Sequence, residues 1–464
     1  MTNLKKQLRR LVIPIFVELA LVMMLGATDT IMLSRHSDNA VAAVGFDNQI
    51  ISLVFLVYQF MSMGAGILCS QYFGAGLRKP LVQVVGIALV LNMFVGGLVS
   101  AILYFYAPSI LIAMGLNEEL MADALIYLQI TGSLSFVQAL AFTFSASLRS
   151  VDKVMYPMIV TGMINILNII GNYVLIFGRF GCPELGVEGA AISTATCRVA
   201  GLLALAYFHR QKHIRSFPLS YFRPFPWREL RNLIQIGVPA MSEELSYCLS
   251  QLVITLFINQ LGTEALATRT YCWNVLMFAI LFCSSVTQGG DILVGHLVGA
   301  GKSRVAYALG NYFYRWSMRV TVSLAVLLAS LSTFILGALT DNQEIIRAGV
   351  WIFIIDCFLE FGRVTNIFAC GTLRAAGDAV FPVIVGVTVQ WCVAVGMAYM
   401  FGIYWGFGII GIWIAFCMDE NIRGVILIRR WHNRKWKDKS FVRRTAPEEL
   451  PNEEVSPALS VDAR

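Results

Sequence analysis

The sequence PIFVE at residues 14–18 returns as PAMSE at residues 239–243, and GAG at residues 74–76 returns as GAG at residues 299–301. Pro14 and Pro239 are 225 residues apart, since 239 − 14 = 225, and Glu18 and Glu243 have the same separation. The same offset relates Gly64 to Gly289, Leu148–Arg149 to Leu373–Arg374, Pro157 to Pro382, Gly186 to Gly411 and Arg198 to Arg423. Chance matches would not keep one register over so long a stretch, so we interpret the chain as a tandem duplication.

The composition is that of a membrane protein. Of the 464 residues, 57% are hydrophobic and only 14% are charged, whereas soluble domains carry about 25% charged residues. About 20 apolar residues cross a hydrocarbon core of about 30 Å. Such segments lie at 11–33, 46–70, 82–106, 121–147, 155–177, 187–208, 232–259, 265–295, 306–338, 346–371, 380–402 and 408–428. We therefore predict an all-α integral membrane protein with 12 transmembrane helices in two homologous six-helix bundles.

The charged residues indicate the orientation of these helices. The net charge is +7, and the basic residues gather in alternate loops at the ends of spans, which favours membrane orientation over nucleic-acid binding. The positive-inside rule places both termini in the cytoplasm, so we expect a multi-pass protein of the cell (inner or plasma) membrane. The predicted parts are an N-terminal lobe at 1–212, a cytoplasmic linker at 213–230, a C-terminal lobe at 231–432 and a disordered cytoplasmic tail at 433–464.

Because each half has an even number of spans, the two copies have the same orientation. Parallel repeats of this kind are a known plan of transporters, with the substrate path between the halves.

Several motifs, in their order and spacing, resemble the multidrug and toxic compound extrusion (MATE) transporters, and most closely their bacterial DinF-like branch within the MOP flippase superfamily. They are Pro14–Glu18, Asp29–Met32, Ser70–Gly76, Asn165, Asn168 and Asn172 before Leu175–Gly178, Gly186–Ala191, Gly262–Ala267 and Gly371–Arg374. The resemblance covers nearly the whole chain except the tail. It implies a V-shaped pair of six-helix bundles that opens alternately to either side. It also implies export of organic, often cationic, compounds in antiport with H⁺ or Na⁺. We further expect a monomer among membrane lipids, with no cofactor and no bound metal.

Two carboxylates of the first span are candidates for coupling. A charged side chain at the bilayer centre costs roughly 2.5–3.5 kcal/mol, so acids there are functional candidates. Glu18 and Asp29 are eleven residues apart, which places them within about 20° of one helix face and about 16 Å apart along the axis. Protonation of Asp29, and its pairing with Na⁺ or a cationic drug, are mutually exclusive, which is the physical basis of antiport. We expect Asp29 to be the coupling residue of the N-terminal lobe, the alternative being a hydrogen-bonded structural carboxylate.

Amides of the fifth span provide further candidates. Asn165, Asn168 and Asn172 share one helix face and can offer oxygens to a cation or donors to Asp29. Thr194, with Ser193, is a candidate to complete the network, although polar packing between helices explains these residues equally well. The resemblance implies an acid at position 172 in archaeal-type relatives, and its absence here puts in doubt any mechanism that needs two acids there.

The second lobe has diverged at the coupling position, because Asp29 corresponds to Ile254. Sodium-coupled relatives use acids of the seventh and tenth spans, so Glu243 with Asp356 or Glu360 is a second candidate cation site. Glu360 and Arg363, three residues apart, are expected to form an ion pair.

Three other functions fit the sequence less well. A flippase or exporter of a lipid-linked or polysaccharide precursor would need more spans or a strongly basic cavity. An intramembrane enzyme is disfavoured because HExxH and GxSxG are missing. The duplication argues against a receptor or scaffold without transport, and the missing GxxxxGK[ST] motif argues against ATP as the energy source. The sequence leaves the substrate and the choice between H⁺ and Na⁺ open.

Overall fold

The computed structural model describes residues 2–214 and 217–442, and this part of the chain contains helices and no strand. The first half contains α1 (Thr2–Ser34), α2 (Asp38–Gly74), α3 (Arg78–Phe105), α4 (Ala107–Ala113), α5 (Glu118–Ser133), α6 (Ser135–Ser150), α7 (Met155–Ile176) and α8 (Gly186–Lys212). The second contains η1 (Leu219–Phe222), α9 (Trp227–Gln260), α10 (Thr263–Gly299), α11 (Ser303–Gly337), α12 (Gln343–Ala375), α13 (Val380–Val389), η2 (Gln390–Val395), η3 (Ala398–Tyr404) and α14 (Gly408–His432).

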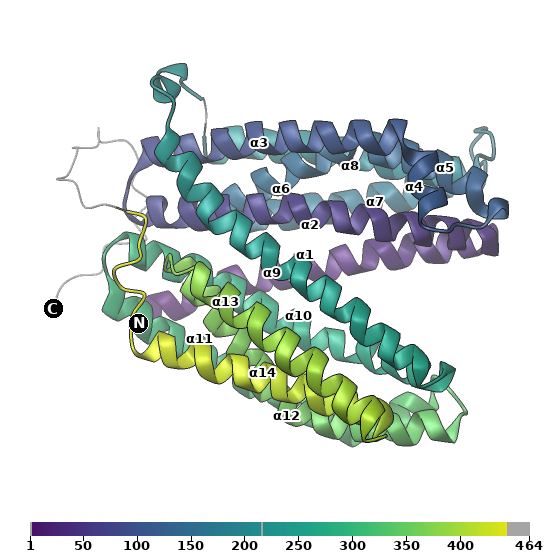
Figure 1. Ribbon diagram of the computed structural model, residues 1–464. Coiled ribbons are helices and arrows are strands. Elements are labelled where there is room, and N and C mark those ends of the chain that lie inside the picture. The colour runs from purple at the N-terminus through teal and green to yellow at the C-terminus, as the bar shows by residue number, and fades with distance from the viewer. Residues whose placement is uncertain (1, 215–216, 443–464) are drawn as a thin grey trace.

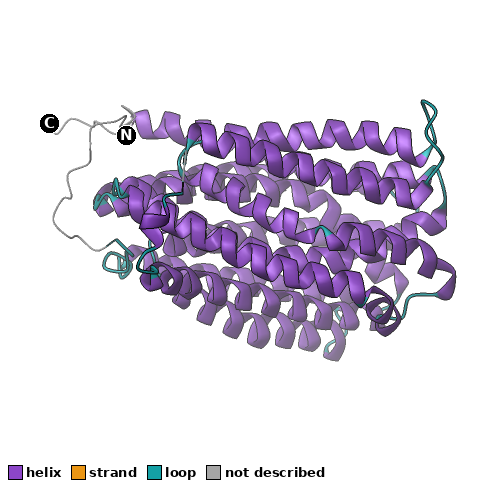
Figure 2. Cartoon of the chain, turned by 90° about the horizontal axis from the view of Figure 1, so that it is seen from above, coloured by secondary structure: helices purple, strands orange, loops and turns teal. Residues whose placement is uncertain are grey.

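Each of the twelve apolar segments lies in one helix or in one run of consecutive helices. Eight spans are long and apolar enough to cross a membrane by themselves, and α5 with α6, bent by 44°, makes a ninth. The other three are α9, α12 and α14, which carry charged residues within their length. The eleventh span runs through α13, η2 and η3, where the helix widens into π turns. The long helices run in a roughly common direction, with the loops at their two ends (Figure 2).

The helices form two bundles, α2–α8 and α10–α14, between which α1 and α9 cross (Figure 1). The bundles are close together at the end where α1 begins and α14 ends, and they diverge toward the other end. We call the first end the linker face, because the connection between α8 and α9 lies there, and the other end the far face. The predicted V-shaped pair of six-helix bundles is therefore confirmed.

Each bundle is completed at the linker face by the lead helix of the other repeat. Leu8 and Leu11, from the first turns of α1, are buried among residues of α10, α11 and α12. Leu233 and Ile236, from the first turns of α9, are buried among residues of α2 and α3. Burial of apolar side chains at about 25 cal/mol per Å² thus holds the repeats together where they meet.

Two reciprocal hydrogen bonds close the linker face. Gln71 Nε2 of α2 donates to the Ala375 carbonyl at the end of α12, at 2.8 Å. His296 Nε2 of α10 lies 2.6 Å from the Ser150 carbonyl at the end of α6, and it donates, because a carbonyl oxygen only accepts. The two bonds occupy equivalent positions of the repeat, since 296 − 71 = 225 and 375 − 150 = 225.

Glycines allow this close approach. A Cβ atom on Gly74 would lie 2.0 Å from the His296 carbonyl oxygen, and one on Gly299 would lie 1.9 Å from the Gln71 carbonyl oxygen. The first glycine of each GAG sequence, Gly74 in α2 and Gly299 in α10, is therefore a point of close backbone contact between these two helices.

The residues after α14 cross from the C-terminal bundle to this contact. Trp436 is fully buried and stacks on Trp431 with ring centroids 4.6 Å apart. Ser440 Oγ and the Phe441 backbone N–H donate to Gln71 Oε1 at 3.1 and 3.0 Å. Of the predicted tail 433–464, residues 433–442 are thus packed against the bundles, and the remainder lies outside the described residues. In the predicted linker, η1 and the start of α9 are helical.

We predict that Gly74→Ala opens the linker face. The new methyl group would meet the His296 backbone, and overpacking of this kind costs about 1–3 kcal/mol, which shifts the equilibrium by about tenfold. In a chain whose ten native cysteines are replaced, a cysteine introduced at Ala375 should then react faster with a thiol reagent. Gly97→Ala is the control, because no atom of another described segment lies within 4 Å of its Cβ position. Equal labelling rates in the two variants would contradict the predicted role of Gly74.

Candidate functional site

Asp29 of α1 heads a chain of polar side chains in the N-terminal bundle. It is half-buried, and its Oδ1 accepts a hydrogen bond from Asn172 Nδ2 at 2.6 Å. Asn172 Nδ2 also lies 3.2 Å from Asn168 Oδ1, and Asn168 Nδ2 lies 3.3 Å from Thr194 Oγ1 of α8. We call these four residues the N-lobe site. It joins α1, α7 and α8.

The spacing of the asparagines explains the geometry. Asn168 and Asn172 lie four residues apart and therefore on one face of α7, where they are buried. The Asn172 amide points one N–H at the carboxylate and the other at the Asn168 side-chain oxygen, so one donor of the chain is directed at Asp29. Hydrogen bonds to a carboxylate stabilise its ionised form. In this site the ionised carboxylate of Asp29 is stabilised, and it can bind either a cation or a proton.

Asn165 does not join this chain, although it was predicted on the same face. Its Nδ2 donates to the Thr161 carbonyl of its own helix at 2.9 Å. Ser193 Oγ lies 3.4 Å from the Asn168 carbonyl oxygen and so contacts α7 through the backbone.

Two residues beside the N-lobe site were not predicted. The charge of Arg198, from α8, acts on Asp29, and its guanidinium lies 5.0 Å from the centre of the Phe55 ring. Tyr127 of α5 is buried, and the charges of Asp29 and Arg198 both reach it. The repetition of Arg198 as Arg423 was a sequence signal for the arginine. Tyr127 had none, because the equivalent residue of the second repeat is Ile352.

The other predicted acid of α1, Glu18, has a different partner. Glu18 is buried and pairs with Arg149 of α6 at 3.5 Å. In the second repeat, Glu243 of α9 pairs with Arg374 of α12. The two pairs are equivalent, since 243 − 18 = 225 and 374 − 149 = 225. Each lobe therefore repeats one glutamate–arginine pair between its lead helix and its fourth span.

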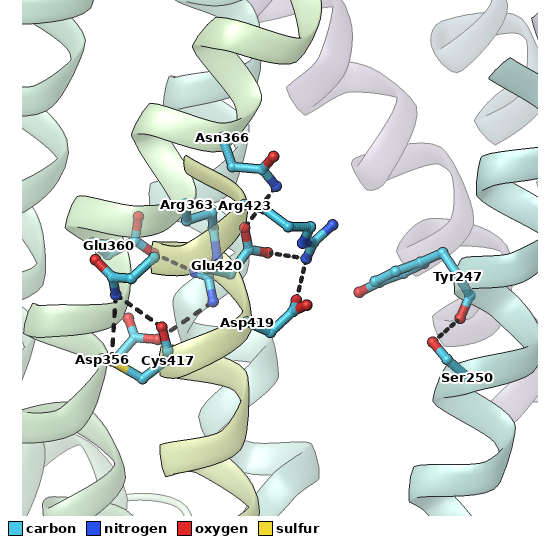
Figure 3. A network of polar contacts seen from close by, with 11 residues as sticks. Tyr247, Ser250, Asp356, Glu360, Arg363, Asn366, Cys417, Asp419, Glu420 and Arg423 are labelled. Atoms are coloured by element: carbon cyan, nitrogen blue, oxygen red, sulfur yellow. Dashed lines mark hydrogen bonds and ion pairs between the residues drawn. The ribbon is translucent and has the colours of Figure 1, made fainter. Parts of the chain in front are cut away.

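The remaining predicted acids belong to a charged cluster in the C-terminal bundle (Figure 3). Arg363 lies between Glu360 and Asp356, at 3.5 Å from the latter, which confirms the predicted Glu360–Arg363 ion pair. On the adjacent α14, Arg423 pairs with Asp419 and, at 3.2 Å, with Glu420. We call these six residues the C-lobe cluster. Glu243 contacts Arg374 and is not brought together with Asp356 or Glu360.

The C-lobe cluster borders a small cavity. Its volume is about 40 Å³, and its walls include Tyr247, Gln251, Trp413, Asp419, Glu420 and Arg423. The Tyr247 side chain points from α9 toward the pair of Asp419 and Arg423 (Figure 3). Such a space holds a few water molecules. Within residues 2–214 and 217–442, no three acidic, histidine or cysteine side chains converge as metal ligands would.

Comparison with known proteins identifies the family. The family model described as MatE matches residues 14–174 and again residues 239–400, and the two matches begin 225 residues apart, at Pro14 and Pro239. The chain belongs to the MatE family. It is therefore a membrane transporter of small molecules and not an enzyme, and the MATE resemblance of the sequence is confirmed.

Two curated relatives are similar over nearly their whole length. The uncharacterized transporter YisQ of Bacillus subtilis is 40% identical over 92% of this chain and 94% of that protein. The probable multidrug resistance protein NorM of Thermotoga maritima is 28% identical over 97% of this chain and 96% of that protein.

Solved structures share the fold of this MATE transporter. One, described as the outward-facing conformation of a multidrug resistance MATE family transporter of the MOP superfamily, superimposes with a TM-score of 0.84 at 18% identity. It covers 93% of this chain and 95% of that chain. A MOP superfamily transporter from Pyrococcus furiosus, whose description reports a binding pocket of reverse polarity, also gives 0.84, at 17% identity, and covers the same shares of the two chains. The twelve-span fold is thus confirmed.

We predict a stability loss for Arg374→Met, because removal of one partner of this partly buried pair leaves the charge of Glu243 uncompensated. For fully buried pairs such losses amount to about 3–5 kcal/mol, and the partial exposure of Glu243 makes the expected loss smaller than that. The double variant Glu243→Gln with Arg374→Met should recover most of it. The matched control is Arg149→Met, with a smaller loss, because the Glu18–Arg149 contact is longer at 3.5 Å. Thermal unfolding of the purified protein in detergent measures all three; a double variant no more stable than Arg374→Met would refute the pairing.

Proposed function

We propose that this MATE transporter exports organic compounds, often cations, in exchange for protons, and that Asp29 couples the two movements. The observation that carries this proposal is the half-buried carboxylate of Asp29, held by the Asn172 amide at 2.6 Å in the interior of the N-terminal bundle. The names of several relatives, among them the NorM protein of Thermotoga maritima, describe probable multidrug resistance proteins, which supports a drug-like substrate.

The coupling follows from competition for one carboxylate. A proton on Asp29 removes the negative charge that a cation needs, and a bound cation removes the site for the proton. If the site is open to only one side of the membrane at a time, each cation that leaves must be replaced by a proton before the site returns. The inward proton gradient then drives export.

The location of Asp29 within the fold supports export, that is, movement of the organic cation out of the cytoplasm. Asp29 lies near the far end of α1, five residues before its last residue Ser34, on the side where the bundles diverge (Figure 1). The linker face carries basic residues such as Arg78, Lys153 and Lys302, so the positive-inside rule assigns it to the cytoplasm. We infer that both termini are cytoplasmic and that the protein lies in the inner or plasma membrane. A single chain contains both lobes, which supports a monomer as the working unit.

We predict that Asp29→Asn abolishes efflux of a fluorescent organic cation from a drug-sensitive host. In vesicles, the wild type should be driven by an imposed pH gradient and not by an imposed Na⁺ gradient, because the site offers one carboxylate and neutral amides. An unimpaired variant driven by Na⁺ would move coupling to Glu243, Asp356 and Glu360. A wild type that moves no cation under either gradient would favour a lipid-linked or polysaccharide precursor as substrate.

The Asn172 hydrogen bond provides a finer prediction. Asn172→Ala removes the donor to Asp29, and a hydrogen bond to a charged group contributes about 1.5–3 kcal/mol. Asp29 should then bind its proton more tightly, so that the pH of half-maximal transport rises by about 1–2 pH units. Asn165→Ala is the matched control, because this amide bonds only to its own helix. If Asn172→Ala and Asn165→Ala had the same pH profile of transport, Asn172 would not belong to the coupling site.

A further inference from the structure

The two hydrogen bonds that close the linker face are equivalent in position but not in chemistry. The donor from α2 is Gln71, whose amide does not titrate, and the donor from α10 is His296. His296 is buried in the last turn of α10, and its Nε2 donates to the carbonyl of Ser150, the last residue of α6. Because the carbonyl end of a helix carries partial negative charge, the ring lies between two helix ends that favour a positive charge.

The other nitrogen of the ring faces an acid of the opposite lobe. His296 Nδ1 lies 3.9 Å from Oδ1 of Asp152, in the connection between α6 and α7. Asp152 Oδ2 accepts a hydrogen bond from Gln7 Nε2 of α1 at 2.7 Å, whereas Oδ1 is buried and has no hydrogen-bond partner among the described residues. In the neutral ring the hydrogen is on Nε2, so Nδ1 is an acceptor that faces another acceptor. A proton on Nδ1 turns this contact into an ion pair between the lobes.

The second repeat has no acid at the equivalent position. Gly377 corresponds to Asp152, since 377 − 152 = 225, and both residues have a positive φ, of 100° and 63°. A Cβ atom on Gly377 would lie 2.2 Å from the Lys439 carbonyl oxygen, because the residues after α14 pass over this glycine before they bond to Gln71. The segment after α14 thus supports the contact of Gln71, and Asp152 supports the contact of His296. Of the two contacts, that of His296 has a titratable donor.

The other charged groups around the ring are paired or exposed. Asp152 is the acid within 4.0 Å of the ring in the described part of the chain. From α2 the ring meets the uncharged Phe73, with ring centroids 5.0 Å apart. Arg149 of α6 pairs with Glu18, and Lys153 is exposed. The remaining basic residues of the adjacent helix ends are Lys6, Arg9, Arg10 and Lys302, which are exposed, and Lys5, which lies 4.5 Å from the centre of the Tyr312 ring.

Opening of the linker face has to separate α10 from the end of α6. A protonated His296 would then lose both the Ser150 carbonyl and the Asp152 carboxylate, whereas a neutral ring would lose the carbonyl alone. The proton is therefore bound more tightly in the closed form, so that low pH favours the closed form and this advantage is lost as the pH rises.

We propose that His296 and Asp152 form a proton-operated latch, which holds the linker face closed at low cytoplasmic pH and releases it as the pH rises. The proton passes from water to His296 Nδ1 and returns to water, and no other bond is made or broken. The assignment of this face to the cytoplasm rests on the proposed function, in which every cycle brings protons into the cytoplasm. The latch then slows transport when the cytoplasm becomes acidic.

The test measures the distance between the lobes at the linker face. Cysteines replace Lys79 and Arg304, two exposed residues at equivalent positions, since 304 − 79 = 225. The full chain, with its native cysteines replaced, carries nitroxide labels at these two positions and is measured by pulsed electron paramagnetic resonance. Asp29→Asn is present throughout, so that the proposed coupling residue does not titrate. The ratio of the open to the closed distance should rise by about tenfold from pH 6 to pH 8, within the limit of about tenfold per pH unit that one proton allows.

Three variants of this labelled chain identify the groups that respond. His296→Gln copies the residue of the other repeat and keeps an N–H for the Ser150 carbonyl, and it should lose the response. Asp152→Asn should lose it as well, and it serves if His296→Gln fails to fold. His432→Gln is the matched control and should keep the response, because His432 is an exposed histidine of the same face that bonds to Tyr307.

Distances that ignore pH in the labelled chain, or an equal response in His296→Gln, would overturn the latch. The measurement needs no substrate and no gradient, so it is independent of the proposed function. If the latch responds as expected but wild-type vesicles export no organic cation, the proposed function is wrong and the latch stands.

Discussion

A charge inside the hydrocarbon layer needs a partner of opposite sign, and the interior of this transporter follows from that constraint. An unpaired charge costs roughly 2.5–3.5 kcal/mol or more there, so a duplicated chain keeps the pairs that it needs. Glu18 with Arg149 and Glu243 with Arg374 are the same contact in each lobe. Each pair joins the lead helix of a repeat to its fourth span, so that the two bundles share this contact. A carboxyl group without such a partner is correspondingly conspicuous, and Asp47, buried in α2, has no hydrogen-bond partner at either carboxyl oxygen among the described residues.

Away from these pairs the lobes have diverged, although they keep one arginine in common. Arg198 and Arg423 are equivalent, but their acids come from different helices. In the first lobe Asp29 of α1 provides the negative charge, and its counterpart in the second lobe is Ile254. In the second lobe the negative charge beside the arginine comes from Asp419 of α14, which occupies the position equivalent to Thr194. The first arrangement places an acid and neutral amides beside each other, and the second places acids and arginines in mutual pairs. The proposed exchange needs an acid that is free to take a cation or a proton, as Asp29 is, whereas Asp356, Glu360 and Asp419 of the C-lobe cluster are paired with arginines.

The linker face shows how a duplication produces a closed contact. Each repeat presents a helix end with free carbonyl oxygens, which helices always leave unsatisfied, and each presents a side chain that donates to the other. The donor is Gln71 in one direction and His296 in the other, because any side chain with a suitably placed N–H can serve a carbonyl. The glycines of the GAG sequence are less replaceable, since their backbones are in contact.

The sequence by itself determined the membrane class, the twelve spans, the duplication and the residues that share a helix face, such as Asn168 and Asn172, because these depend on length, hydropathy and helical periodicity. Only the tertiary structure decided which faces meet. Asn165 has the same spacing but bonds within its own helix, and Tyr127 of α5 comes under the charges of Asp29 and Arg198 without any sequence signal. Periodicity tells which way a side chain leaves its helix but not what lies opposite, since lipid and a neighbouring helix are equally apolar. A buried carboxyl without a partner is therefore recognised only once the helices are packed.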